Sequence, residues 1–377
     1  MRVIGKNTGW LGWVVAAVSV SVAPLLSSLQ IAAVLSAGRP AQDSSKKNTG
    51  KVQTFVLGNA TAQLSSASTD SSVPQYDAWL YPDAPGGLNE LVTIGHVHVV
   101  RAEFLHVNDD GSMQVINQDA SHPAGYSDNV VQTIAAHSDQ RYITVSADNP
   151  DAMVAAMNNP ATITQMVDFA NKIHFGIELD WEGYGSWTPQ FYGQFKTFLG
   201  RLGAALHANE HYLIVDGPPI YDSTSQGWYQ WKYEDIAPLA DFVTMMVYDN
   251  EYDTGVGGSI APRAWAQSCL QWLKDKAGDK GIPGLAAYGY KGAESTGAIT
   301  VNTSADISRT LQGQLTALNI SGSGMARNAD GELTQTVSGV FYDYSDKTTV
   351  QMRVQQAQDA GFNRISVWSL GGNPWPD

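Results

Sequence analysis

The chain has 377 residues, 43% of them hydrophobic and 10% aromatic, and its formal net charge at pH 7 is −14. This hydrophobic and aromatic content suffices for a hydrophobic core and excludes a wholly disordered chain. The acidic excess argues against a protein that binds nucleic acid through the phosphate backbone. The single cysteine, Cys269, excludes an intramolecular disulfide and a zinc site made of thiolates alone.

The first part of the chain differs in kind from the rest. Arg2 and Lys6 precede an uncharged stretch, residues 7–38, that is rich in Val, Ala and Leu. A basic flank before an apolar run is typical of an export signal, and this run is also long enough to span a bilayer, which takes about 20 residues. We expect residues 1–40 to be a signal peptide or a membrane anchor, with a buried core helix as the alternative. The protein is then extracellular, either secreted or anchored to the membrane by this segment.

Residues 41–74 are mostly Ser, Thr, Asn, Gln, Ala and Lys, a composition that indicates a flexible linker. From residue 75 to residue 377 the sequence is uniformly globular in character. No internal repeat and no second linker interrupts it, so we expect one domain there.

Within this domain, short β-type runs alternate with longer segments of helical pattern. The predicted strands are Tyr76–Tyr81, Val97–Val107, Arg141–Ala147, Gly176–Trp181, His211–Asp216, Phe242–Tyr248, Gly284–Tyr288 and Arg364–Leu370. The predicted helices are Ser127–His137, Thr162–Lys172, Pro189–His207, Pro262–Ala277, Ser304–Leu318 and Thr348–Ala360. Strands separated by helices in this way favour an α/β fold of the (β/α)8 TIM-barrel type over an open sheet. The chain ends soon after Leu370, which leaves no room for a full eighth helix.

The most informative strand carries acidic residues at every second position. Glu178, Asp180 and Glu182 alternate with apolar residues, and side chains on a strand alternate between its two faces. We expect the carboxylates to point into the barrel, with Glu182 nearest its C-terminal mouth. Neighbouring carboxylates raise the pKa of at least one of them, which suits a general acid near neutral pH.

Structural and metal-binding roles for these acids remain open as well. The carboxylates could form a solvated edge, or be neutralised by buried arginines, for which Arg101 and Arg141 are the candidates. They could also hold Mg²⁺ or Ca²⁺, since oxygen ligands suit those ions. His96 and His98 form a spaced pair at the start of an early strand, which places them at the bottom of the barrel. We expect no metal and no cofactor.

The acidic strand also resembles a known signature. Residues 176–182, Gly-Ile-Glu-Leu-Asp-Trp-Glu, are similar to the DxxDxDxE motif of glycoside hydrolase family 18, the chitinase-like (β/α)8 enzymes. Residues 241–249 resemble the sixth strand of that family, which ends Met-x-Tyr-Asp, and residues 365–371 resemble its eighth strand with a tryptophan floor. Two departures stand out: Phe175 replaces the first Asp of the signature and Glu178 replaces the second.

Two further segments match the family in order and spacing, namely residues 288–290 (Tyr-Gly-Tyr) and 341–343 (Phe-Tyr-Asp), so the resemblance covers most of residues 76–377. Within the family, the Tyr-Gly-Tyr segment and the Trp-Ser-Leu-Gly tail are similar to the branch that includes spore-cortex-lytic enzymes and domains fused to polysaccharide deacetylases.

The resemblance implies a glycoside hydrolase that cleaves β-1,4-linked N-acetylhexosamine polymers, such as chitin or peptidoglycan, by retaining, substrate-assisted catalysis. The residues it implies as catalytic are Glu182, Asp180 and Tyr248. Those it implies as substrate-binding are Glu178, Trp368, Met246, Asp249, Glu103 and Trp79.

Two other functions remain open. A chitinase-like lectin would keep the groove without turnover, although Glu182 is retained here, and a structural or adhesive surface protein could use the same barrel. Trp187, Trp228 and Trp231 follow predicted strands, where they could contact an extended glycan or pack against helices. We expect a monomer whose partner is a GlcNAc-containing polysaccharide, with no nucleic-acid partner.

Overall fold

The computed structural model describes residues 73–318 and 324–376, so the predicted signal or anchor and all but the end of the predicted linker lie outside the described residues. Within that part of the chain, no helix combines the length and the apolar character that a membrane span requires.

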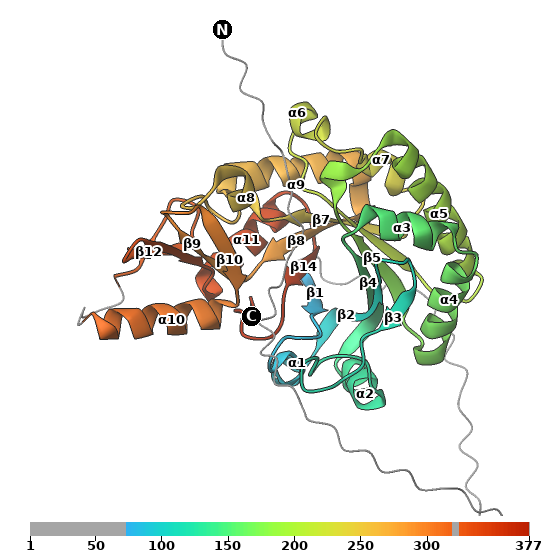
Figure 1. Cartoon of the computed structure of the whole chain (residues 1–377), viewed down its shortest axis with the longest axis horizontal. Helices are drawn as coiled ribbons and strands as arrows, with labels where there is room; N and C mark the ends of the chain where they lie inside the picture. Colours follow the sequence, from blue (N-terminus) through green and yellow to red (C-terminus); the bar gives the residue numbers. More distant parts are fainter. Residues whose placement is uncertain (1–72, 319–323, 377) are drawn as a thin grey trace, which may run out of the picture. The chain divides into compact units, whose positions relative to one another are not determined.

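Eight parallel strands close into a barrel, which confirms the predicted TIM-barrel fold (Figure 1). Closure occurs because β1 pairs with both β2 and β14. In barrel order the strands are β1 (Gln75–Leu80), β2 (Val97–Val107), β4 (Ser138–Ala147), β5 (Gly176–Trp181), β6 (Leu213–Gly217), β7 (Phe242–Val247), β8 (Gly281–Ala286) and β14 (Arg364–Trp368).

Helices connect successive strands and cover the outside of the barrel (Figure 1). After β1 and β2 come α1 (Gly87–Ile94) and, beyond the short hairpin strand β3 (Met113–Val115), α2 (Asp128–Ala136). The next connections contain α3 (Pro150–Asn158), α4 (Ala161–Ile173), η1 (Tyr184–Ser186), α5 (Pro189–His207), α6 (Ser223–Gln226), α7 (Tyr233–Ile236), α8 (Asn250–Thr254), α9 (Arg263–Ala277) and η2 (Gly278–Lys280). The last barrel helix is α11 (Lys347–Asp359), and within the described residues β14 leads only into turns and loop, as expected.

Strand β5 shows why the sequence folds in this way. Its odd-numbered residues face the helical layer, where the Trp181 ring stacks on Phe198 of α5 at 5.3 Å between centroids. Its even-numbered residues face the barrel interior, and Glu178 has no exposed surface. The predicted orientation of the acidic face is therefore confirmed. Helix α5 begins where Pro189 occupies the first turn and the Thr188 side chain accepts the amide N–H of Phe191.

An insertion between β8 and α11 was not predicted. It contains a five-stranded antiparallel sheet in the order β10-β9-β13-β12-β11, together with α10. Its elements are β9 (Gly289–Ala293), β10 (Ala298–Asn302), α10 (Ser304–Ala317), β11 (Ala326–Arg327), β12 (Leu333–Val337) and β13 (Val340–Tyr344). The helix predicted at Ser304–Leu318 exists, but it packs on this sheet through a small core of its own made of Ile307, Leu311, Leu315, Val337 and Tyr342.

Aromatic side chains closely approach Gly217 at the end of β6, and this contact offers a test of the packing. A Cβ on Gly217 would lie 2.6 Å from the Trp231 ring and 2.7 Å from the Tyr233 hydroxyl. We expect Gly217→Ala to lower the free energy of unfolding by about 1–3 kcal/mol, the usual cost of overpacking. Gly200 on the exposed side of α5 has nothing within 4 Å of such a Cβ. Gly200→Ala should instead raise stability by about 0.5–1 kcal/mol, and thermal denaturation of both variants checks the pair.

Candidate active site

The floor of the barrel interior is organised around one arginine. Arg101 on β2 is fully buried and donates hydrogen bonds to Asp77 on β1 at 2.5 Å, to Glu178 on β5 at 2.6 Å and to the Thr244 hydroxyl on β7 at 2.7 Å. Asp216 on β6 lies 3.5 Å from the same guanidinium. One side chain thus ties together five strands.

The lower part of the acidic strand is therefore neutralised by a buried arginine, one of the roles that the sequence left open. Both oxygens of Glu178 accept hydrogen bonds, one from Arg101 at 2.6 Å and one from Thr144 at 2.5 Å. Arg141 takes no part, since it donates to the carbonyl of Ala135 and lies over the Phe175 ring. Phe175, where the family signature has its first Asp, is packed in the core.

Charge inside the barrel is not fully balanced by arginine. Burial raises the pKa of Asp77, but Arg364 and Arg101 outweigh this effect and hold that pKa below its usual range. For Asp216, burial and the neighbouring Glu178 raise the pKa well above its usual range, against the influence of Arg101. Burial also raises the pKa of Glu178, although Arg101 and Thr144 act in the opposite direction. The lower layer thus holds an ionised Asp77 beside two arginines, together with Asp216, which favours its protonated form although it lies 3.5 Å from Arg101.

Asp180 and Glu182 lie higher on the same face, where no arginine of residues 73–318 or 324–376 pairs with them. Burial raises the pKa of Asp180 well above its usual range, and Glu182, Asp216 and Glu178 raise it further. Burial also raises the pKa of Glu182 to about 7, with Asp249 as the largest charged contributor. A carboxylic acid that stays protonated near neutral pH is what a general acid requires.

The backbone of Glu182 is fixed on both sides. Its amide N–H donates to the carbonyl of Ala147 at the end of β4, at 2.7 Å, and its carbonyl accepts the indole N–H of Trp187 at 3.0 Å. Trp187 is itself packed among aromatic side chains that include Trp231. Both tryptophans therefore support the site from the helical layer, whereas Trp228 is exposed.

Tyr248 and Asp249 follow β7 at the same mouth. Burial raises the pKa of the Tyr248 phenol well above its usual range, and Asp249, Asp180 and Glu182 add to this effect, so the hydroxyl is a neutral donor. Asp249 has a positive φ of 67° and accepts a hydrogen bond from the hydroxyl of Tyr288. Burial raises its pKa to about 6, and the Tyr288 hydrogen bond works in the opposite direction.

Aromatic rings line the other side of the interior. Trp368 at the end of β14 is partly exposed and meets Trp79 and Tyr81 edge-to-face, at centroid distances of 5.3 Å and 5.8 Å. Trp79 is only 4% exposed, and its indole N–H donates to Ser366 at 2.5 Å. Trp368 can thus offer a ring face to a ligand, while Trp79 supports it from within the barrel.

The remaining predicted site residues occupy different depths. Met246 on β7 is nearly buried, and Glu178 has no surface to offer a ligand. Glu103 on β2 lines an open pocket and accepts a hydrogen bond from Ser146 at 2.5 Å. Burial raises the pKa of Glu103 to about 7. The structure therefore brings the predicted residues to one mouth, with Glu178 and Trp79 beneath it.

Several residues of this network were missed from the sequence. They are Asp77, Thr144, Ser146, Asp216, Thr244 and Tyr288. A polar residue at an inward position of an otherwise apolar strand was the available signal, most clearly for Asp216 at the end of the fifth predicted strand.

The predicted histidine pair lies at the opposite end of the barrel. His96 and His98 contact Asp139, at 2.8 Å and 3.2 Å. No group of three or more His, Cys, Asp or Glu side chains within the described residues is arranged to hold a metal ion.

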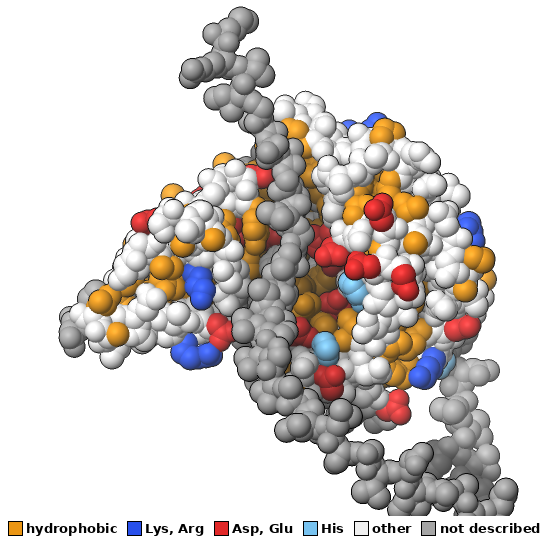
Figure 2. Space-filling view, in the orientation of Figure 1, with side chains coloured by type: hydrophobic (Ala, Val, Ile, Leu, Met, Phe, Trp, Pro, Cys, Tyr) orange, Lys and Arg blue, Asp and Glu red, His pale blue; other side chains and the backbone are white. Residues whose placement is uncertain are grey.

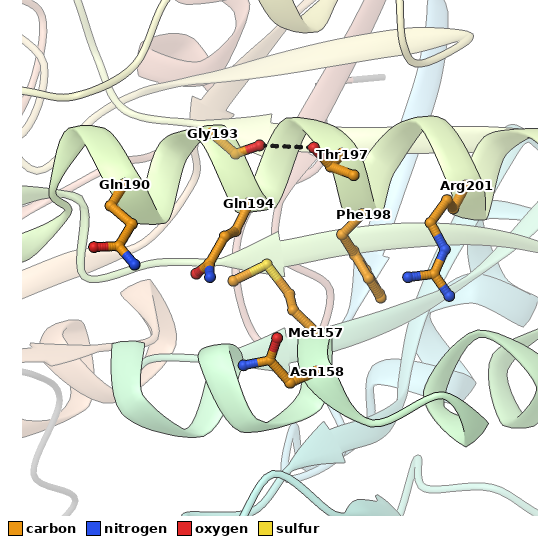
Figure 3. Close-up of a pocket in the computed structure, with 8 residues that line it drawn as sticks. All are labelled: Met157, Asn158, Gln190, Gly193, Gln194, Thr197, Phe198 and Arg201. Carbon is orange, nitrogen blue, oxygen red and sulfur yellow. Dashed lines mark hydrogen bonds between the residues drawn. The ribbon is translucent and has the colours of Figure 1, made fainter.

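A separate surface groove lies in the helical layer. Figure 3 shows Met157 and Asn158 of α3 facing Gln190, Gln194 and Phe198 of α5 across it. None of the carboxyls described above lines this groove, so it is not part of the candidate active site.

Comparisons with known proteins agree with this geometry. The sequence profile of the family described as "Glycosyl hydrolases family 18" matches residues 76–373. An "uncharacterized glycosylase", YvbX of Bacillus subtilis (strain 168), is 31% identical over 130 residues, which are 33% of this chain and 37% of that protein. The match thus spans little more than a third of that relative.

Solved structures show the same fold. A class V chitinase from Pseudomonas fluorescens Pf-5 superimposes with a TM-score of 0.64 at 19% identity, over 80% of this chain and 96% of that one. The spore cortex-lytic enzyme SleL of Bacillus megaterium QM B1551 gives 0.64 at 14% identity, over 80% and 71%. A chitinase-like agglutinin from Robinia pseudoacacia gives 0.61 at 16% identity, over 79% and 95%. At these identities the likeness shows the fold alone.

The arginine at the barrel floor provides a test of the electrostatic network. We expect Arg101→Met to cost about 3–5 kcal/mol of stability, because it leaves the carboxylates of Asp77 and Glu178 buried without their partner. The loss should be larger at pH 8 than at pH 5, since protonation relieves an unpaired buried carboxylate. Thermal denaturation at both pH values measures this. Arg141→Met removes the same charge from a half-buried position outside the network and should change stability much less. Equal losses in the two variants would contradict the proposed network.

Proposed function

The chain belongs to glycoside hydrolase family 18, and on this basis we propose that it cleaves β-1,4-linked N-acetylhexosamine polymers by retaining, substrate-assisted catalysis. The observation that carries the proposal is the geometry of β5. Asp180 and Glu182 follow Glu178, which pairs with Arg101, on the inward face toward the mouth of the barrel. Burial raises the pKa of Glu182 to about 7. The candidate polymers of this class are chitin and peptidoglycan.

In this mechanism Glu182 donates its proton to the glycosidic oxygen. The carbonyl oxygen of the substrate's own acetamido group attacks the anomeric carbon, and the bond to the leaving sugar breaks as that sugar takes the proton. The product of this step is a cyclic oxazolinium ion. Glu182, now a carboxylate, accepts a proton from water as the water opens the ring, which restores both the acid and the anomeric configuration.

The surrounding residues orient the acetamido group. Asp180 accepts its N–H and stabilises the positive charge that develops on it, and Tyr248 donates its hydroxyl to the acetamido oxygen. Glu178 acts from below through its charge, because both of its oxygens already accept hydrogen bonds from Arg101 and Thr144. Trp368 packs against the apolar face of the same sugar.

We also propose that the protein works outside the cytoplasm. The support is the basic flank and apolar run of residues 1–40, which is typical of exported chains. Wall and matrix polysaccharides are found in that compartment.

The role of Glu182 is tested by Glu182→Gln, which keeps the size of the side chain and removes the proton donor. Turnover of chromogenic GlcNAc-oligomer glycosides should fall by at least about 100- to 10,000-fold, the contribution typical of general acid catalysis. Retained activity in the variant would refute the mechanism. If the wild type binds these oligomers without cleaving them, the chain is a lectin. If it cleaves them, parallel digests of chitin oligomers and peptidoglycan, analysed by mass spectrometry, identify the polymer.

The pH dependence of kcat/KM gives a second test. The general acid must be protonated, so kcat/KM should fall as the pH rises through the pKa of Glu182, which is about 7. Asp249→Asn removes the largest charged contributor that raises this pKa, so the alkaline limb should move to lower pH. Asp253→Asn, an exposed carboxylate on helix α8, which begins directly after Asp249, is the matched control and should leave the limb in place. A limb that both variants leave unmoved would mean that Asp249 does not act on Glu182.

A further inference from the structure

Histidines gather at the end of the barrel opposite the candidate active site. Six of the eight histidines of the chain lie where it enters β2, β4, β5 and β6: His96, His98, His137, His174, His207 and His211. Parallel strands all begin at the same end of a barrel, and its active-site mouth lies at the other end. These six residues therefore share one surface, which we call the histidine face.

The two ends of the barrel carry different charges. At the mouth, Asp83, Glu103 and Asp119 line a hollow beside β2, and Figure 2 shows acidic side chains gathered around it. At the opposite end, the segments that carry the histidine face contain the cations Arg141 and Lys172. Histidine gains a positive charge as the pH falls from about 8 to about 5, so this end becomes more cationic in mildly acidic solution.

Two carboxylates contact three of these histidines. Asp139 lies 2.8 Å from His96 and 3.2 Å from His98, and Asp241, just before β7, lies 3.0 Å from His207. Burial raises the pKa of Asp139, but its hydrogen bonds with the two histidines outweigh this effect and hold that pKa below its usual range. Each of the two carboxylates offsets one positive charge of the protonated face.

The other three histidines contribute unequally. Burial lowers the pKa of His211 and the neighbouring His174 lowers it further, whereas Glu210 acts in the opposite direction. His211 therefore gains its proton at a lower pH than a free imidazole does. His174 is exposed, and His137 is half-buried and hydrogen-bonds to the carbonyl of Gly95 at 2.5 Å. Once protonated, the histidines and the two fixed cations outnumber these three carboxylates.

Exposed apolar side chains accompany the histidines. Val73, Val92 and Tyr212 are 68%, 47% and 40% exposed, and they are three of the six exposed large hydrophobic side chains among the described residues. Val73 precedes β1, Val92 lies in the last turn of α1, and Tyr212 directly follows His211, so all three lie toward this end of the barrel. Tyrosine and aliphatic side chains suit the boundary between water and lipid, where apolar contact adds to attraction by anionic headgroups. The histidine face therefore fits an anionic lipid surface better than a soluble anion.

The chain also enters the barrel at this end. Strand β1 begins at Gln75, and the predicted linker, residues 41–74, joins it there. An anchor in residues 1–40, one of the two predicted roles of that segment, would keep the histidine face toward the membrane and the mouth away from it.

We infer that the histidine face docks on a membrane surface rich in anionic lipids when the solution is mildly acidic, and leaves that surface as the pH rises. Docking then directs the mouth of the barrel away from the membrane, toward polymers outside it. The inference rests on the proposed location outside the cytoplasm and goes beyond the proposed hydrolysis, since docking requires no turnover.

Docking is measured on the full chain by hydrogen exchange of its backbone amides. The probes are vesicles of phosphatidylcholine alone and vesicles of equal parts phosphatidylcholine and phosphatidylglycerol. At about pH 5.5 the anionic vesicles should slow exchange in the segments that lead into β2, β4, β5 and β6 by about tenfold relative to the neutral ones, because each added positive charge strengthens attraction to an anionic surface. At about pH 7.5 the two kinds of vesicle should give equal exchange. Comparing them at one pH removes the direct effect of pH on exchange.

Matched pairs of substitutions separate the histidine face from histidines elsewhere. His174→Asn combined with His207→Gln should remove at least half of the protection at about pH 5.5 and leave turnover of GlcNAc-oligomer glycosides in solution unchanged. His106→Gln combined with His122→Gln removes two histidines near the mouth and should leave the protection in place.

Equal exchange with both kinds of vesicle at about pH 5.5 would overturn the inference and leave the proposed hydrolysis standing. Equal loss of protection in the two paired variants would also overturn it, since the effect would not belong to this face. Protection by soluble inorganic polyphosphate with none by the anionic vesicles would assign the face to a soluble polyanion, which contradicts docking on a membrane.

Discussion

The interaction on which the site depends is that of Arg101 with the carboxylates inside the barrel. The buried guanidinium pairs with Asp77 at 2.5 Å and with Glu178 at 2.6 Å, and Arg364 and Arg101 hold the pKa of Asp77 below its usual range. Because Arg101, Asp77 and Glu178 come from three different strands, the ion pairs also fix the register of the strands around the interior. The acidic strand β5 is thus anchored at its lower end by charge and on its outer face by the stacking of Trp181 on α5.

This anchoring leaves the carboxyls along one strand with different partners. Glu178 is paired with Arg101, whereas Asp180 and Glu182 lie two and four residues further on, without an arginine partner in the part of the chain that the structure describes. Burial then acts on them unopposed and favours their neutral forms. The same strand therefore presents an arginine-paired carboxyl at the floor and carboxyls that favour their protonated forms at the mouth, and strand periodicity alone gives them a common direction. The Glu178 variant of the family signature is compatible with this arrangement, because Thr144 and Arg101 satisfy both of its oxygens.

Much of the barrel could be predicted from the sequence because its signals are local. Alternation in residues 176–182 was sufficient to orient Glu178, Asp180 and Glu182, and the predicted bounds Val97–Val107, Gly176–Trp181 and Pro189–His207 agree with the structure. Strand β8 begins at Gly281, three residues before its predicted start. The sequence does not indicate this earlier start, because Pro283 inside the segment argues against a strand. The insertion was missed because its strands are short and mostly half-buried, so their hydrophobic alternation is weak. The partners of Arg101 could not be predicted either, since Asp77 and Asp216 are brought to it by barrel closure rather than by sequence spacing.

A second buried arginine joins the insertion to the barrel in the same manner. Arg353 on α11 pairs with Glu332, and its other donors reach the Ala286 carbonyl at the end of β8 and the Ser345 hydroxyl. Glu332 in turn accepts the amide N–H groups of Ile260 and Ala261, which lie in the connection after β7. The insertion is therefore held by a buried ion pair that backbone groups of the barrel also contact, and it is attached next to the loop that carries Tyr248 and Asp249. Tyr288, which donates to Asp249, directly precedes β9 of the insertion. The position of Asp249, and with it the proton affinity of Glu182, thus depends on a subdomain that supplies none of the carboxyls proposed as catalytic.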